Sequence, residues 1–170
     1  AGAAFCKIEQ DTGKMVWKSM KDKGGMYDSA FSSPVFATIR EKEQILVQSR
    51  TELAGVDIDS GGVLWRQPIK AFRGMNILTP LPYDNGVYTS AYGGRSHFFG
   101  IKRDQQSWKS AEQWENKGQA YMGSPILFED HVYLHLRNQR FACYNLKTGE
   151  EAWVSDERFG KYMSLVRQGN

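Results

Sequence analysis

The sequence lacks most of the features that would assign a function at once. No window approaches the roughly 18 consecutive apolar residues that a transmembrane helix needs, so we expect no direct membrane span. No run of five or more Lys or Arg occurs, and the formal net charge is only +3, which argues against a nucleic-acid partner. The chain has only 2 cysteines, and two thiols do not identify the redox compartment.

Recognisable catalytic motifs are absent as well. The sequence has neither a glycine-rich phosphate loop nor a nucleophile elbow. His131 and His135 would lie on one strand, with their Cα atoms roughly 13 Å apart, which is too far for shared metal ligation. His97 stands alone, and an isolated histidine is more often a surface or hydrogen-bonded residue than a ligand. We therefore predict no catalytic residue and no metal site in this chain.

The most informative feature that the sequence does contain is a repeat. Four related segments each consist of an expected strand, a polar turn and a second expected strand that carries a tryptophan. The tryptophans recur about every 45 residues, a period typical of β-propeller blades. Glycine in the turns supplies the positive φ that a tight hairpin needs. The repeated tryptophans are Trp17, Trp65, Trp108 and Trp153, and the turn glycines are Gly13, Gly61 or its neighbour Gly62, and Gly149.

A second landmark runs in phase with the tryptophans. A Ser-Pro or Thr-Pro pair precedes a short apolar run in three of the periods, and proline is tolerated at the first position of a strand. Further β-rich runs bring each period to four strands, which we letter A to D, with no helical periodicity between them. The sequence thus predicts an all-β propeller of four-stranded antiparallel blades. The pairs are Ser33-Pro34, Thr79-Pro80 and Ser124-Pro125, with a degenerate copy at Ser164, and the further runs are 44–48, 86–90 and 131–135.

The expected blades divide the chain unevenly, although all belong to one propeller segment. Both ends fall inside a repeat, so we expect an incomplete part of a larger ring, with a homodimer that completes the ring as the alternative. The expected repeats are a partial blade at 1–32, complete blades at 33–78, 79–123 and 124–162, and the first strand of another blade at 163–170.

These residues resemble the PQQ-like, or quinoprotein-like, β-propeller family. The stretch from Cys143 to Trp153 matches the family's docking motif, whose tryptophan packs between adjacent blades. The third copy departs from it, because the turn before Trp108 is shortened and lacks glycine. Through Gly74-Met-Asn-Ile and Trp114-x-Asn-Lys117 the chain is also similar to a bacterial envelope-associated branch that includes the propeller lipoprotein of outer-membrane assembly. The resemblance implies a ring of seven or eight blades and a periplasmic or cell-envelope location.

The resemblance also bears on cofactors. True quinoprotein dehydrogenases hold pyrroloquinoline quinone (PQQ) beside a pair of adjacent cysteines and bind Ca²⁺ through acidic and amide side chains. This sequence has no Cys-Cys pair, and its acidic residues fall mainly in turns. We expect no cofactor here, and PQQ with Ca²⁺ belongs only to the alternative that the chain is part of a quinoprotein dehydrogenase.

The order of strands sorts the loops onto two faces. In a four-stranded meander the D–A and B–C loops emerge together, and the A–B and C–D turns emerge on the opposite side. The D–A/B–C face collects cations, aromatic residues and methionines, which are enriched in interface cores, whereas the opposite face collects acidic residues. Packing of these side chains over the central channel would explain the pattern equally well. The candidate binding residues are Arg73, Asn76, Lys117, Tyr121, Met122, Arg158, Lys161, Tyr162, Arg95 and Arg137.

Three functions remain open from the sequence. The favoured one is a non-catalytic propeller that binds a protein or peptide, acidic or extended, on the D–A/B–C face and acts as a scaffold in the bacterial cell envelope. The second is part of a PQQ-dependent quinoprotein dehydrogenase. The third is a propeller that binds a carbohydrate or another small ligand at the channel mouth.

Overall fold

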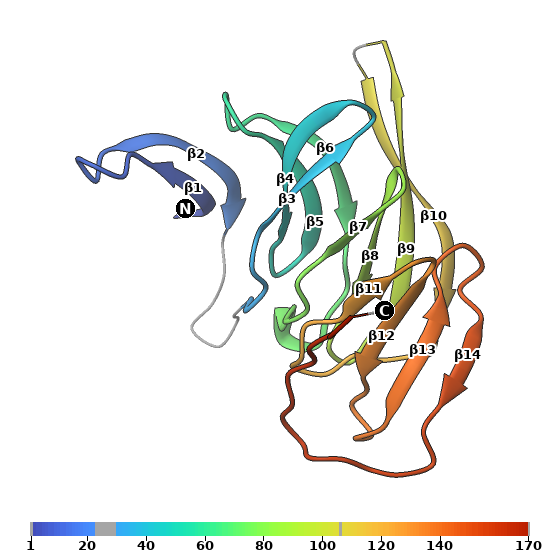
Figure 1. The fold of residues 1–170 in the computed structure, drawn as a ribbon. Coiled ribbons are helices and arrows are strands. Elements are labelled where there is room, and N and C mark those ends of the chain that lie inside the picture. The colour runs from blue at the N-terminus through green and yellow to red at the C-terminus, as the bar shows by residue number, and fades with distance from the viewer. Residues whose placement is uncertain (1, 23–29, 106, 170) are drawn as a thin grey trace.

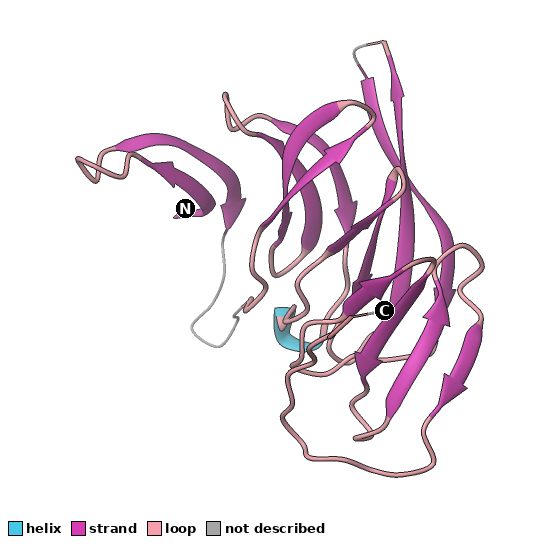
Figure 2. Ribbon diagram, viewed as in Figure 1, coloured by secondary structure: helices cyan, strands magenta, loops and turns pink. Residues whose placement is uncertain are grey.

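The computed structural model describes residues 2–22, 30–105 and 107–169 of the chain. They form three four-stranded sheets and one two-stranded sheet, all antiparallel and each built from consecutive strands. The sheets follow one another in chain order like the blades of a fan (Figure 1). Nearly all the regular structure is strand, and a short 3₁₀ turn, η1 (Phe72–Gly74), lies among the loops (Figure 2). The chain is therefore an all-β propeller, as the repeat predicts.

The strands alternate with short turns along the chain. The two-stranded sheet pairs β1 (Gly2–Ile8) with β2 (Met15–Asp22). The second sheet consists of β3 (Val35–Ile39), β4 (Lys42–Gln48), β5 (Glu52–Asp57) and β6 (Val63–Pro68). The third consists of β7 (Leu81–Tyr83), β8 (Gly86–Ser90), β9 (Ser96–Asp104) and β10 (Ser107–Asn116). The fourth consists of β11 (Ile126–Phe128), β12 (His131–His135), β13 (Phe141–Asn145) and β14 (Glu151–Val154).

The apolar core lies between successive sheets. Side chains alternate between the two faces of a strand, so an inner strand of a propeller blade contributes to two cores at once. In β4, Ile45 and Val47 belong to the core shared with the β1–β2 sheet, whereas Leu46 belongs to the core shared with the third sheet. A third core joins the third and fourth sheets through Tyr88 and Leu134, among others. The inner strands of the second and third sheets are buried on both faces because each of these sheets is packed between two others.

The hairpin turns have the backbone conformations that the sequence suggests. Gly13, Gly61 and Gly149 have φ of 68°, 71° and 76°, in the left-handed region that favours glycine. The third copy of the turn lacks glycine, and there Gln105 adopts a φ of 48°. This hairpin is also longer than the others, because β9 and β10 extend outward beyond the sheets (Figure 1).

The structure differs from the prediction at the end of the chain. We expected residues 163–170 to begin another strand, but the described residues 163–169 contain no strand. A strand needs a neighbour for its backbone hydrogen bonds, and no described strand lies after β14. Leu165 and Val166 instead line an apolar cavity of about 340 Å³ against the β11–β14 sheet. Arg167 places its guanidinium 4.0 Å from the centre of the Phe128 ring there.

Candidate functional site

The D–A and B–C loops lie together on one side of the sheets and hold one another through their backbones. Phe72 N–H donates to the carbonyl of Tyr92 at 2.8 Å, which joins a D–A loop to a B–C loop. Arg137 N–H likewise donates to the Gln119 carbonyl at 2.9 Å. Asn76 is fully buried, and its side-chain amide donates to the Ser49 carbonyl at 2.7 Å. The two sets of loops therefore form one connected surface, which we call the loop face.

Four aromatic rings from different loops form a row on the loop face. The ring centres of Phe72 and Tyr92 are 6.2 Å apart, those of Tyr92 and Tyr121 are 6.1 Å apart, and those of Tyr121 and Tyr162 are 5.8 Å apart. These separations lie within the range in which aromatic pairs attract one another. Tyr121 is buried beneath its neighbours, whereas Phe72 and Tyr162 are 54% and 65% exposed. The aromatic row is anchored at its centre and open at its ends.

Three cations accompany the aromatic row. Arg73 lies 5.2 Å from the centre of the Phe72 ring, and Arg137 lies 5.1 Å from that of Tyr92. The Lys161 ammonium lies 5.5 Å from the centre of the Tyr162 ring. Such contacts are favourable and hold the long cationic side chains near the rings. None of the three cations forms an ion pair with a carboxylate within the described parts of the chain.

The other predicted binding residues have different roles. Asn76 is buried and ties two loops together, so it belongs to the support of the loop face and does not offer its amide to a partner. The Arg95 guanidinium forms an ion pair with Glu115 at 3.2 Å. Arg158 is exposed, and Met122 is 42% exposed, close in sequence to Tyr121.

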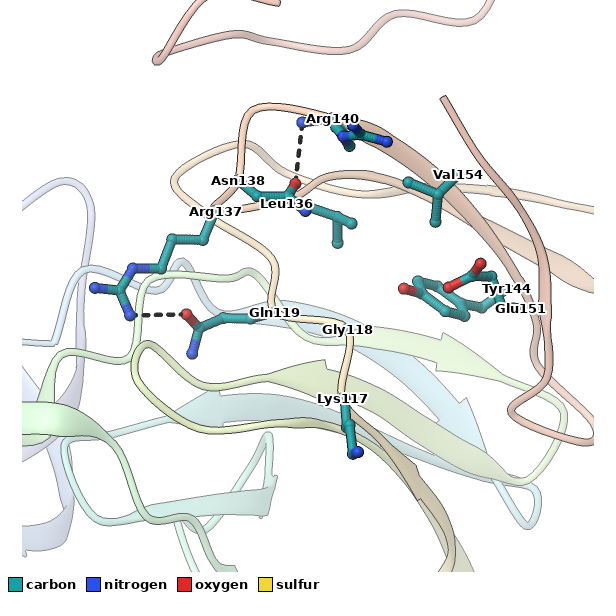
Figure 3. A pocket seen from close by; sticks show the side chains of 10 residues that line it. All are labelled: Lys117, Gly118, Gln119, Leu136, Arg137, Asn138, Arg140, Tyr144, Glu151 and Val154. Carbon is teal, nitrogen blue, oxygen red and sulfur yellow. Dashed lines mark hydrogen bonds between the residues drawn. The ribbon is translucent and has the colours of Figure 1, made fainter. Parts of the chain in front are cut away.

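Lys117 lies at a larger opening on the loop face. A cavity of about 700 Å³ between the third and fourth sheets is lined by Lys117, Arg137, Arg140 and Glu151 (Figure 3). Arg137 donates to the Gln119 side chain at 3.2 Å, and in Figure 3 the Lys117 and Arg137 side chains extend to separate sides of the opening. Tyr144 is buried at its wall, and burial, aided by Glu151, raises the pKa of this phenol to about 12.

The sequence prediction missed Phe72 and Tyr92. Phe72 is next to the predicted Arg73, and Tyr92 lies in the B–C loop between β8 and β9. An aromatic residue in an expected loop was the available signal for both. The row itself could not be predicted, because its members come from different loops that only the folded sheets bring together.

Two of the repeated tryptophans, Trp17 and Trp65, pack between successive sheets on the side of the C–D turns. Trp17 packs over Gly61 in the turn of the next sheet, where an added Cβ would lie 2.6 Å from the indole. Trp65 is 3% exposed and donates its indole N–H to Gln44 at 2.7 Å within its own sheet, while its ring belongs to the core shared with the third sheet. Trp153 lies on the last sheet and is 47% exposed.

In the third sheet, the structure assigns the docking contact to Trp114 instead of Trp108. Trp114 packs over Gly149, where an added Cβ would lie 2.5 Å from its ring, and its indole N–H donates to the Leu146 carbonyl at 2.8 Å. Trp108 lies farther out on β10, with the Arg103 guanidinium 5.2 Å from its ring centre. The β9–β10 hairpin is longer than the corresponding hairpins of the other sheets, so the repeat spacing points to Trp108 near its tip.

The opposite face carries acidic residues that are partly neutralised. Asp57 pairs with Lys42 at 2.6 Å, and this contact holds the pKa of the carboxyl well below its usual range. Asp130 pairs with Lys147 and accepts a hydrogen bond from Tyr83 of the preceding sheet at 2.5 Å. The contact with Lys147, followed by that with Tyr83, lowers the pKa of Asp130. These carboxylates therefore stabilise a turn, in the case of Asp57, and a contact between two sheets, in the case of Asp130.

The residues present do not fit the PQQ site that the resemblance describes. Cys6 is on β1 and Cys143 is on β13, in the first and last sheets, and both thiols are free. Cys143 is buried, which raises the pKa of its thiol. The described residues therefore offer no adjacent thiol pair on which a planar quinone could stack.

No helix in the described residues is long and apolar enough to span a bilayer. The chain matches a protein-family model described as outer membrane protein assembly factor BamB over residues 1–155. No curated protein matches the chain. Among solved structures, BamB from Moraxella catarrhalis is similar, with a TM-score of 0.58 and 19% identity over 86% of this chain and 45% of that one.

Two quinohemoprotein alcohol dehydrogenases are also similar in structure. ADHIIG from Pseudomonas putida HK5 gives a TM-score of 0.56 at 14% identity, and the enzyme from Comamonas testosteroni gives 0.52 at 16% identity. Each comparison covers 76% of this chain and 21% of the enzyme. The chain thus spans less than half the length of these solved structures, and identities this low show a shared fold alone.

Proposed function

Because the chain belongs to the family of outer membrane protein assembly factor BamB, we propose that it is a non-catalytic propeller that binds a polypeptide through its loop face. It acts as a scaffold in the bacterial cell envelope, and its partner is an acidic or extended segment of a protein. The observation that carries this proposal is the aromatic row of Phe72, Tyr92, Tyr121 and Tyr162 with its three cations.

The chemistry of the row favours a polypeptide partner. Aromatic residues and Arg are enriched at protein interfaces, where a ring provides large contact area at a small cost in side-chain entropy. Phe72 and Tyr162 leave more than half of their side-chain surface exposed at the two ends of the row. An extended segment that crosses the row would bury both rings and place its carboxylates near Arg73 and Lys161.

The rigidity of the loop face supports the same proposal. The side chain of Asn76 holds the loop of η1 against the B–C loop that follows β4. The backbone hydrogen bond from Phe72 to Tyr92 and that from Arg137 to Gln119 hold the loops on either side of the Tyr92 ring. Loops that are already ordered lose little conformational entropy when they bind. The cations also raise the local concentration of an acidic partner, an effect that salt screens.

Site-specific photo-crosslinking tests the proposal. A photoreactive benzoylphenylalanine replaces Tyr162 in the full-length protein, and the matched control replaces Glu41, an exposed residue in the A–B turn of the opposite face. After irradiation of cells that make the protein, we expect a discrete adduct with one polypeptide at Tyr162 and none at Glu41. Mass spectrometry of the adduct identifies the partner, and cell fractionation locates it.

Two outcomes would contradict the proposal. An adduct at Glu41 but not at Tyr162 would move the partner to the opposite face. A second variant carries the photoreactive residue at Phe72, at the other end of the row. The absence of an adduct in both the Tyr162 and the Phe72 variants, when each melts like the wild type, would exclude the loop face as a stable polypeptide-binding surface.

A further inference from the structure

A groove between the second and third sheets holds a cluster of metal-binding side chains that the proposed function does not use. The groove has a volume of about 630 Å³ and runs between β6 and β10, from Gln67 to the loop residues Phe72 and Gly94. His97, Glu112 and Glu115 line it, and one donor atom from each of these residues lies within 4.8 Å of the others.

The pairing of β9 and β10 explains why these three side chains converge. His97 and Glu115 are directly opposite each other in the antiparallel pair, so their side chains share a face of the sheet. Glu112 is opposite Phe99, which is two residues from His97 and therefore on the same face. The β-bulge between Glu112 and Trp114 sets this register, since in an unbroken ladder Gln113 would be opposite Phe99.

The imidazole of His97 is already positioned toward the carboxylates. Its Nδ1 lies 2.9 Å from Oε2 of Glu112. Its ring stacks on Phe99, with ring centres 5.5 Å apart and planes 14° apart. Only 19% of the His97 side-chain surface is exposed, whereas both carboxylates are 44% exposed. The ring is held from one side while the donor atoms face the groove.

We propose that His97, Glu112 and Glu115 bind a divalent transition-metal ion of the Zn²⁺ class. One imidazole nitrogen and two carboxylate oxygens suit Zn²⁺, whose bonds to such ligands are about 2.0 to 2.2 Å long. Donors around a tetrahedral ion with these bonds are about 3.4 Å apart, so small side-chain rotations bring the present cluster to that geometry. The fourth position faces the groove and is filled by water.

Arg95 is the competitor of the metal ion at this site. Its guanidinium lies 3.2 Å from Oε1 of Glu115, and both side chains are nearly half exposed. An arriving cation must displace this ion pair before Glu115 can coordinate it. Removal of Arg95 therefore frees a ligand and removes a like charge from the site, so it should strengthen metal binding.

Calorimetric titration of the purified full-length protein with ZnCl₂ tests the site. We expect one equivalent to bind to the wild type, at least tenfold weaker binding to the His97→Ala and Glu112→Gln variants, and severalfold tighter binding to Arg95→Ala. His131→Ala is the matched control, because this histidine, like His97, lies near the start of a strand but is outside the cluster, and it should bind like the wild type.

Substitution with Co²⁺ provides a second readout, since a nitrogen and oxygen ligand set of low coordination number gives visible absorption much stronger than the weak band of six-coordinate aqueous Co²⁺. The proposal fails if the wild type binds no Zn²⁺, or if His97→Ala and Glu112→Gln bind it as tightly as the wild type. It also fails if Arg95→Ala weakens binding. Circular dichroism of each variant shows that the fold is retained, and the test is independent of whether the loop face binds a polypeptide.

Discussion

The two faces of the propeller use similar residue types for different purposes. On the face of the C–D turns, tryptophan packs over a glycine of the next sheet, Tyr83 donates to Asp130 of the next sheet, and carboxylates pair with lysines of their own sheet, so the side chains satisfy one another. On the loop face, aromatic rings contact each other in a row and their cations have no carboxylate partner within the described residues. The difference indicates that the turn face joins the blades, whereas the loop face is left with surface that a partner can bury.

The largest effect on stability should come from the turn face, at Trp114. Trp114→Ala removes a partly buried ring that packs over Gly149 and a hydrogen bond to Leu146. We expect a loss of about 3 kcal/mol in the free energy of unfolding, measured by denaturant titration. Trp108→Ala is the matched control and should cost less, about 1 to 2 kcal/mol, because this ring is partly buried against the core between the second and third sheets but does not pack over a glycine of the fourth. Equal losses would mean that Trp114 does not dock the fourth sheet.

Two turn glycines, Gly61 and Gly13, distinguish the cost of a packing clash from the cost of backbone strain. Gly61→Ala adds a Cβ that would lie 2.6 Å from the Trp17 ring, at a residue whose φ is 71°. Gly13→Ala has the same strain, with a φ of 68°, but no heavy atom within 4 Å of the added Cβ. We expect a loss of about 1 kcal/mol for Gly13→Ala and about 2 to 3 kcal/mol for Gly61→Ala in thermal and denaturant unfolding. Similar losses would show that strain alone makes these glycines necessary.

The free energy of unfolding should depend on pH through His135, which is buried beneath the loop face. His135 is 1% exposed, and its ring stands in an apolar environment against Phe141. Burial lowers the pKa of its imidazole below the ordinary value of 6.5, so the unfolded chain binds a proton that the folded chain does not. The neutral His135 imidazole therefore leaves the folded state fully stable above about pH 6.5. As the pH falls below that value, the free energy of unfolding decreases by at most about 1.4 kcal/mol per pH unit.

Unfolding titrations between pH 5 and pH 8 check this effect, because His135→Gln should flatten the dependence. A slope that persists in His135→Gln would assign the proton to another group.

The smallest effect on stability should come from the aromatic row itself. Tyr162→Ala removes a ring that is 65% exposed, so we expect a change of less than about 0.5 kcal/mol in the free energy of unfolding. The same variant, or Lys161→Ala, should weaken binding of the crosslinked partner at least tenfold, and Lys161→Ala should reduce the salt dependence of binding. A variant that loses stability and retains binding would reverse the roles of the two faces.

The repeat predicts most of the fold, because tryptophan, proline and turn glycine mark the strands at a regular period. The period predicts Trp108, but the β9–β10 hairpin is extended, so Trp108 lies near its tip and the ring that packs over the next sheet is Trp114. No local pattern reveals this shift, since it depends on the pairing of two strands. In the same way, Arg73, Tyr121, Lys161 and Tyr162 could be placed on one face from strand order, whereas their alignment with Phe72 and Tyr92 depends on loop packing.

Hydrogen–deuterium exchange of the full-length protein, alone and with the partner identified by crosslinking, tests most directly whether the loop face binds the partner while the turn face only joins the blades. The account predicts new protection in the loops around Phe72, Tyr92, Tyr121, Arg137 and Tyr162, with none in the turns around Glu41 and Gly61. Protection confined to those turns, with exchange in the loops unchanged, would contradict it.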